Sequence, residues 1–302
     1  MLAVEKQPLL SPPHHNIMSA TEDTDWLHTT AGSRSAANED FSAPVADTGA
    51  SSVKSNTLQR LQSIAIIISL ILSPISIILV SVWASALGGV SWKEGESKLV
   101  FNWHPIMMIT AYAIMNFGAL VFRISGTSSY QAGVGMAPEK RGKAKVMHAS
   151  LWTLSFVFGL VGIIAVFKSH NDSVSGYIAN LYSLHSWVGM TVLTNYISQF
   201  LFGALVFGGV LKGSRLRNPV MMELHKFSGA YIHFLAMAAI LMGIQEKEGF
   251  VGCAYKVESA DLIPILNYGK IPYACKISHG LGLVILFMGL FTSFGLARFP
   301  TD

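Results

Sequence analysis

Residues 145–171 read KVMHASLWTLSFVFGLVGIIAVFKSHN, and this stretch decides the fold because it can cross a membrane and carries a histidine near each end. His148 lies near its start, and His170 lies near its end. Between them, residues 149–167 contain no charged side chain. The hydrocarbon core of a bilayer is about 30 Å thick, and roughly 20 apolar residues in a helix span it. The stretch therefore predicts a transmembrane helix that reaches both faces of a membrane.

The composition extends this prediction to the whole chain. Of its 302 residues, 51% are hydrophobic and only 13% are charged, which is too apolar for a soluble domain of this length. The net charge of +4 does not indicate a nucleic-acid partner, because the basic residues lie in short loops between apolar runs. Two cysteines argue against a disulfide scaffold or a zinc module, whereas ten histidines leave metal ligation by imidazole open. We expect a multi-pass protein surrounded by membrane lipid.

Six apolar runs, each long enough to span a bilayer, define the expected domain organisation. They lie at about 61–87, 100–122, 147–167, 181–211, 220–244 and 275–297. The sequence therefore predicts an all-α membrane protein with a six-helix domain at 57–298 and a short cytosolic C-terminus at 299–302. Residues 1–56 are rich in Ser, Thr, Ala, Asp and Pro, and predict a disordered cytosolic tail.

The charge pattern predicts which side of the membrane each loop occupies. The loops after the second and fourth runs are rich in Lys and Arg, whereas the other three balance bases against acids. The basic side chains are Arg123, Lys140, Arg141, Lys143 and Lys145 in the first of these loops, and Lys212, Arg215 and Arg217 in the second. Because basic loops stay in the cytosol, we expect both loops and both termini to be cytosolic.

Residues 5–10, EKQPLL, resemble the acidic dileucine sorting signals of lysosomal and vacuolar membrane proteins. This resemblance favours a lysosomal, vacuolar or other internal membrane, and a chance match in a tail of simple composition is the alternative. The start of the chain lacks a basic segment followed by an apolar one, so we do not expect a cleaved signal peptide.

Four histidines lie near the N-terminal ends of consecutive predicted helices, from the second to the fifth: His104, His148, His185 and His225. Consecutive helices run in opposite directions, so His104 and His185 share the non-cytosolic layer while His148 and His225 share the cytosolic one. Two layers of two histidines are what two bis-imidazole haems in a four-helix core require. One alternative is four unrelated polar residues at helix ends. Another is a haem-free transporter that relays protons through intramembrane histidines.

Glycines at repeated offsets support two haem sites. Gly189 and Gly229 each follow a histidine by four residues, which places them one turn away on the same helix face. Gly118 and Gly162 each follow a histidine by fourteen residues, or roughly 21 Å along a helix, near the depth of the opposite layer. All four could make room for a porphyrin, although glycines also serve ordinary helix packing in membranes. His233 and His279 are not expected to be ligands.

The motifs around these histidines resemble those of the cytochrome b561 family over residues 57–298. They are FNWHPIMM around His104, GALVFR ending at Arg123, KVMH at His148, FKSHN at 167–171, YSLHSW around His185, and HxxxG at His225 followed by GIQEK at 243–247. The family pairs His104 with His185 and His148 with His225, which the alternation of helix directions also predicts. Phe122 departs from the tyrosine that the family usually has before the arginine.

The resemblance implies an ascorbate-dependent transmembrane oxidoreductase with two b haems. Cytosolic ascorbate would donate one electron, which would cross the membrane to a non-cytosolic acceptor. That acceptor would be monodehydroascorbate, making the protein a monodehydroascorbate reductase, or a ferric chelate, making it a ferric reductase. The resemblance also favours a homodimer.

Polar residues beside each layer are candidates for the two substrate sites. Ascorbate is an anion, and three bases near the His148 layer could bind it, although topology alone would also require them: Arg123, Lys143 and Lys145. Beside the His185 layer, the residues that resemble the family's non-cytosolic pocket are Phe167, His170, Asn171 and Tyr182. His170 could exchange the proton that accompanies reduction of monodehydroascorbate. Cys253 and Cys275 share the last non-cytosolic loop, where a disulfide could join them.

Overall fold

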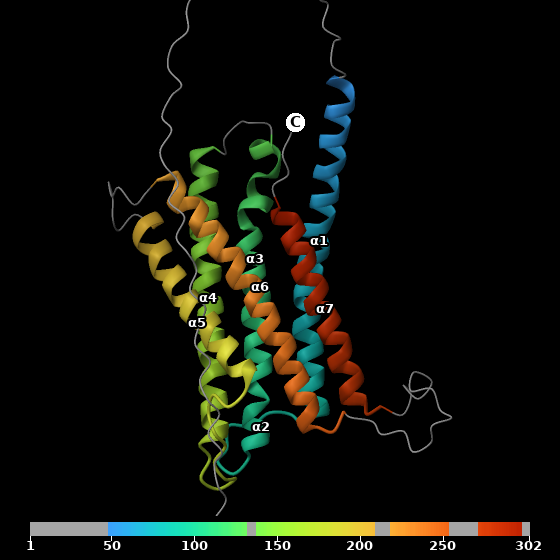
Figure 1. Ribbon diagram of the computed structural model, residues 1–302, viewed down its shortest axis with the longest axis vertical. Coiled ribbons are helices and arrows are strands. Elements are labelled where there is room, and N and C mark those ends of the chain that lie inside the picture. The colour runs from blue at the N-terminus through green and yellow to red at the C-terminus, as the bar shows by residue number, and fades with distance from the viewer. Residues whose placement is uncertain (1–47, 132–136, 209–217, 254–270, 298–302) are drawn as a thin grey trace, which may run out of the picture. The chain divides into compact units, whose positions relative to one another are not determined.

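The computed structural model describes residues 48–131, 137–208, 218–253 and 271–297, and every regular element in these ranges is a helix. In chain order (Figure 1) they are α1 Thr48–Ala86, α2 Ser97–Phe101, α3 Trp103–Gln131, α4 Pro138–His170, α5 Leu184–Phe202 with a π-helical turn at Gly203–Phe207, α6 Pro219–Phe250 and α7 Tyr273–Leu296. Six of these helices are long and apolar enough to cross a membrane. The predicted all-α, six-span fold is confirmed.

Two helices begin earlier than the apolar pattern predicts. α1 begins at Thr48, inside the segment predicted to be a disordered tail, and residues 1–47 lie outside the described ranges together with the EKQPLL sequence. α4 begins at Pro138, so four of the basic residues predicted for a loop, Lys140, Arg141, Lys143 and Lys145, lie on its first turns, and Arg123 lies on α3. Proline suits the first position of a helix, and polar first turns carry no hydrophobic signal that would mark them as helical.

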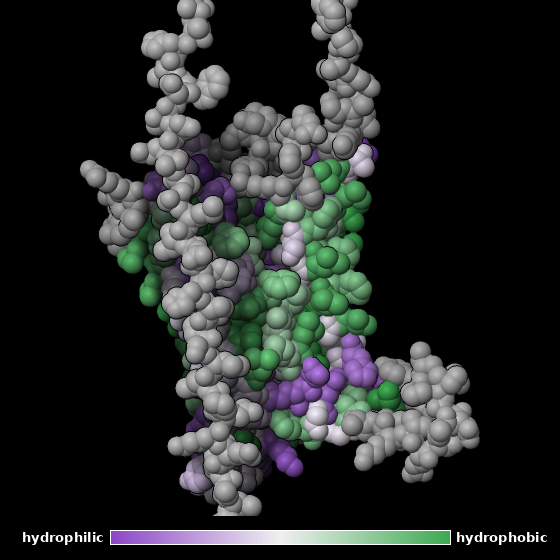
Figure 2. Space-filling model, in the orientation of Figure 1, coloured by the Kyte–Doolittle hydropathy of each residue, from purple (hydrophilic) through white to green (hydrophobic). Residues whose placement is uncertain are grey.

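The helices pack so that α3, α4, α5 and α6 surround the histidines while α1 and α7 lie together at one side (Figure 1). α3 packs along α4, α6 packs along α5, and α1 and α7 contact each other and α3. Figure 2 shows hydrophobic side chains over the middle of the bundle and polar ones gathered toward its ends. Large apolar side chains such as Ile64, Ile67 and Ile78 on α1 are more than half exposed, as suits a surface that faces lipid.

A buried polar network fastens α1 and α7 to α3. The Asn116 side-chain amide donates to the hydroxyls of Ser69 and Ser73, both at 2.9 Å, and the Thr292 hydroxyl donates to the Asn116 amide oxygen. The hydroxyls of Ser69 and Thr292 lie 2.6 Å apart. All four residues are fully buried. Polar groups inside a bilayer need partners within the protein, so this network specifies how the two outer helices dock.

Asn116→Leu is expected to lower the free energy of unfolding by about 1–3 kcal/mol, because the hydroxyls of α1 and α7 lose their shared partner. Thermal unfolding in detergent measures this effect. Asn195→Leu is the matched control, since among the described residues the Asn195 amide donates only to Thr191 O of its own helix. Equal melting temperatures for the two variants would contradict a docking role for the network.

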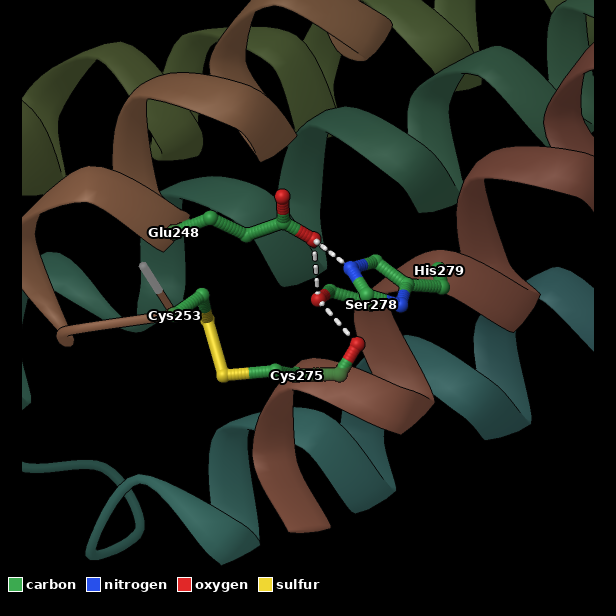
Figure 3. Close-up of a disulfide and its surroundings, with 5 residues drawn as sticks. All are labelled: Glu248, Cys253, Cys275, Ser278 and His279. Atoms are coloured by element: carbon green, nitrogen blue, oxygen red, sulfur yellow. Dashed lines mark hydrogen bonds and ion pairs between the residues drawn. A yellow bond between two sulfur atoms is a disulfide. The ribbon is translucent and has the colours of Figure 1, made fainter. Parts of the chain in front are cut away.

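A disulfide joins Cys253, just after α6, to Cys275 in the first turn of α7 (Figure 3). The structure thereby answers a question that the sequence leaves open. Beside the disulfide, the Ser278 hydroxyl donates to the Glu248 carboxylate, and His279 Nε2 lies 3.6 Å from the same carboxylate. His279 therefore belongs to the contact between α6 and α7 at this end of the bundle.

Candidate functional site

The four histidines meet as two pairs at two depths of the bundle. The ring centroids of His104 on α3 and His185 on α5 lie 6.0 Å apart, and those of His148 on α4 and His225 on α6 lie 6.3 Å apart. Two imidazoles that bind one metal ion from opposite sides, with bonds of about 2 Å, have centroids about 6 Å apart. The pairing is the one predicted from alternating helix directions, and each pair has the spacing for one iron.

The histidines of α3 and α4 are oriented by each other's helix. His104 Nδ1 lies 3.0 Å from Gly162 O, and His148 Nδ1 lies 2.8 Å from Gly118 O. A carbonyl oxygen only accepts hydrogen bonds, so both Nδ1 atoms carry the proton and both Nε2 atoms keep a lone pair. This is the tautomer that binds a metal through Nε2. Each glycine therefore lies at the depth of the opposite layer, as the fourteen-residue spacing predicts.

Gly118 and Gly162 were predicted to leave room for a porphyrin, but in the structure they face side chains of the neighbouring helix. A Cβ atom on Gly118 would lie 2.9 Å from the Trp152 side chain, and one on Gly162 would lie 3.2 Å from Met107 and Met108. Both glycines thus face the interface of α3 and α4. Their absent side chains let the two helices approach closely enough for the histidine rings to reach the carbonyl oxygens.

The other two predicted glycines differ from each other. A Cβ atom on Gly189 would have no heavy atom within 4 Å, and Gly189 borders a cavity, so it does adjoin open space. A Cβ atom on Gly229 would instead meet the Gln199 amide at 3.6 Å, which places Gly229 in the contact between α6 and α5.

Two further glycines lie directly against the histidine rings of α5 and α6. A Cβ atom on Gly243 would approach His185 Cε1 to 2.7 Å, and one on Gly203 would lie 3.2 Å from His225 Cε1. His185 Nδ1 also lies 2.9 Å from Ala239 O, whereas His225 Nδ1 is buried without a hydrogen-bond partner among the described residues. Sequence reasoning gave these glycines no role, although Gly243 opens the GIQEK motif.

Between the two layers, aromatic side chains fill the middle of the bundle. Trp152 and Phe156 of α4 pack against Tyr196 of α5, with ring centroids 5.0 and 5.9 Å apart, and the Tyr196 hydroxyl donates to Trp152 O at 2.6 Å. His233 is buried with its ring 4.7 Å from that of Tyr112. His233 is thus a packed core residue between the layers, as its offset from His225 predicts.

A cavity of about 810 Å³ borders the His104–His185 pair, and its lining runs from Tyr112 and Tyr196 in the middle of the bundle to the loop after α4. Its volume lies within the range of roughly 300–1,000 Å³ that ligand sites occupy. Phe167, His170 and Tyr182 line it, as predicted. The predicted Asn171 does not: its side chain is exposed where α4 ends. The loop after α4 instead brings Asn180 to the cavity.

His170 is held in the cavity wall by the residues around it. Its Nδ1 lies 3.1 Å from the Asn180 amide oxygen and therefore donates to it. The ring stacks on Phe101 with centroids 6.3 Å apart and an interplanar angle of 11°. The Tyr182 ring lies 6.3 Å away, and burial together with Glu246 raises the pKa of the Tyr182 hydroxyl above its ordinary value. The Tyr182 hydroxyl therefore stays protonated at physiological pH.

The three bases predicted for the opposite site have different surroundings. Arg123 Nη2 donates to Leu296 O and Ala297 O, at 3.0 and 2.9 Å, where it satisfies carbonyl groups at the C-terminal end of α7. Lys143 is exposed and pairs with Glu139 at 2.8 Å. Lys145 lies two residues further along α4. The Phe122 ring, where the family usually has tyrosine, lies 5.5 Å from that of His148.

Comparisons with known proteins agree with this architecture. The family model for eukaryotic cytochrome b561 matches residues 103–251. The lysosomal membrane ascorbate-dependent ferrireductase of Mus musculus is 36% identical over 205 residues, which cover 67% of this chain and 74% of that protein. The transmembrane ascorbate ferrireductase 1 of Arabidopsis thaliana is 32% identical over 181 residues, covering 60% and 70%. The plasma membrane ascorbate-dependent reductase of Rattus norvegicus is 30% identical over 223 residues, covering 73% and 69%. The family model matches the segment that carries all four histidines, and the chain covers 74% of a relative to which it is 36% identical. This chain therefore belongs to the cytochrome b561 family.

Proposed function

We propose that this protein is an ascorbate-dependent transmembrane oxidoreductase that carries electrons from cytosolic ascorbate through two b haems to an acceptor on the other side of the membrane. The observation that carries the proposal is the presence of two facing histidine pairs, 6.0 and 6.3 Å apart, at two depths of a membrane-spanning bundle. Family membership implies haem b. The proposed number of haems, two, rests on the two histidine pairs.

The proposed ligands are His104 with His185 and His148 with His225. Haem bound between them would supply reversible one-electron redox chemistry. The side chains present fit such a group, because three of the four rings donate Nδ1–H to a backbone carbonyl and keep Nε2 for a metal. The open space at Gly189 beside the His104–His185 pair supports the same assignment.

The relatives' names support ascorbate as the donor and a ferric chelate as the acceptor, and monodehydroascorbate is the second acceptor that we propose. For the donor site we propose Lys143 and Lys145, near His148 on α4, as the groups that attract the ascorbate anion. The two Arg123 hydrogen bonds go to α7 carbonyls, so we propose that Arg123 adds positive charge to this site while its guanidinium group stays bonded to α7.

On the acceptor side, Phe167, His170 and Tyr182 form part of the cavity wall, and His170 would exchange a proton with monodehydroascorbate. Asn171 would act only from outside the cavity.

We further propose that both termini lie in the cytosol and that the His104–His185 layer faces the other compartment. The disulfide near the end of α6 supports this orientation, since disulfides persist in oxidising compartments. Among the relatives, one is named as lysosomal and another as a plasma-membrane protein. EKQPLL favours the lysosomal or vacuolar membrane for this chain. A homodimer in the lipid bilayer completes the proposal.

A haem-free proton-coupled transporter is the alternative, and the contacts of the histidines do not favour it. A histidine that passes a proton through its ring uses both ring nitrogens, whereas His104, His148 and His185 each have Nδ1 committed to a carbonyl that only accepts.

Purified protein is expected to show a b-type α-band after addition of ascorbate, and a larger band after dithionite. Vesicles loaded with ascorbate should then reduce an external ferric chelate, and the rate with monodehydroascorbate as acceptor ranks the two candidates. Vesicles without internal ascorbate provide the control. Absence of the α-band under dithionite would contradict the proposed function and favour the transporter.

A further inference from the structure

Two lysines lie at the opening of the cavity beside the His104–His185 pair. Lys98 on α2 and Lys247 near the end of α6 both line it, together with Phe101 and His170. Lys247 Nζ lies 4.4 Å from the centroid of the Phe101 ring, and the same ring stacks on His170. A lysine over an aromatic face is held in position by cation–π attraction. The arrangement fixes one positive charge beside the predicted acceptor residue.

One carboxylate, that of Glu246, lines the same cavity as these two lysines. Among the residues that the structure describes, no carboxylate lies within 4.0 Å of the ammonium group of Lys98 or Lys247. Glu246 accepts a hydrogen bond from the Ser183 hydroxyl at 3.0 Å. Both ammonium groups belong to the lining of the same cavity. Two like charges in one cavity mouth are unfavourable unless an anion binds between them.

Asp172, at the same end of the bundle, is likewise engaged. Its carboxylate accepts the backbone N–H groups of Ser175, Gly95 and Val174, and these bonds hold the pKa of Asp172 below its ordinary value. The Asp172 carboxylate thus holds the loop after α4 against the segment before α2, and it does not belong to the cavity lining.

We propose that Lys98 and Lys247 form an anion-binding subsite that holds the carboxylate groups of a ferric chelate at the cavity opening. This inference rests on the proposed function and names the class of its acceptor. In the step it serves, ascorbate is oxidised to monodehydroascorbate with loss of one electron and one proton on the donor side, and Fe(III) of the chelate gains that electron and becomes Fe(II). The chelate exchanges no proton and breaks no covalent bond. Lysine ammonium groups suit this task because they bind carboxylates as point charges.

The test uses vesicles that contain the full-length protein and internal ascorbate, with two external one-electron acceptors of opposite charge. Ferric citrate is the anionic acceptor, and hexaammineruthenium(III) is the cationic one. In Lys98→Gln/Lys247→Gln, the KM for ferric citrate is expected to rise about tenfold with kcat nearly unchanged, because two charge-assisted contacts are lost. The KM for hexaammineruthenium(III) should stay the same or fall. Added salt should raise the wild-type KM for ferric citrate more than that of the variant.

Lys93→Gln is the matched control, since Lys93 precedes α2 and is exposed outside the cavity lining. It should leave both KM values unchanged. Lys247→Arg keeps the charge and should keep the KM for ferric citrate within about twofold, which separates charge from packing should Lys247→Gln fold poorly.

Three other outcomes can be distinguished, and each would contradict a named part of the proposal. KM values that do not depend on lysine charge, or an equal effect of Lys93→Gln, would exclude a role for these two lysines. A charge effect seen with monodehydroascorbate but not with ferric citrate would exclude the chelate as the ligand. The α-band recorded in the same vesicles separates this failure from a failure of the proposed function. A missing ascorbate-reduced band in wild-type protein contradicts the function itself, whereas a normal band with charge-independent KM values overturns only the subsite.

Discussion

His148→Leu is expected to lower the haem content by about half and to slow reduction of the remaining haem by ascorbate more than about tenfold. Leucine offers no lone pair to a metal, so His225 loses the partner whose ring lies 6.3 Å from its own. The His104–His185 pair is untouched by the change and should keep its haem. The ratio of haem to protein, the α-band after dithionite and the rate of ascorbate reduction measure these effects.

His279→Leu is the control for this experiment, because it makes the same substitution at a histidine that contacts Glu248 and belongs to neither pair. It should keep both haems and the wild-type rate. Ascorbate kinetics that are unaltered in His148→Leu would refute either the assigned pairing or the side at which ascorbate donates. A dithionite-reducible band that survives in His148→Leu shows that the variant has folded.

The pairing of the histidines could be predicted because it depends only on helix order. Once six spans are recognised, consecutive helices must alternate in direction, and residues near their N-terminal ends must alternate between the faces. The same rise per residue placed Gly118 and Gly162 at the depth of the opposite layer. What these glycines contact could not be predicted, because the rotation of α3 about its axis relative to α4 depends on bulky neighbours such as Trp152.

Loops and long-range contacts account for the other differences. Asn171 and Asn180 are equally plausible neighbours of His170 by composition, but the chain folds back so that Ile178 N donates to His170 O at 2.9 Å, and this brings Asn180 to the ring. No periodic pattern marks such a turn. Arg123 was expected to face an anion, but α7, which begins 150 residues later in the chain, presents the carbonyl groups of its C-terminal end beside it.

Gly243→Val is expected to remove or distort the haem of the His104–His185 pair while leaving the other haem reducible by ascorbate. Even a Cβ atom at this position would lie 2.7 Å from His185 Cε1, and valine adds two methyl groups beyond it. The ring cannot move away freely, since its Nδ1 is bonded to Ala239 O. Either the ring rotates out of line with His104 or α5 separates from α6, and both movements break the facing geometry.

Redox titration and low-temperature spectra of Gly243→Val should therefore show one haem component in place of two, and electron transfer to an external acceptor should fall at least about tenfold. Gly249→Val is the matched control, because it makes the same change on the same helix at a position where a Cβ atom would have no neighbour within 4 Å. The two variants make the same change in intrinsic helix propensity, so a difference between them reports the contact with His185. Two intact haem components in Gly243→Val would mean that the close approach of α6 to His185 is not what holds this ring in place. The hydrogen bond from Nδ1 to Ala239 O would then be the feature that orients the ring.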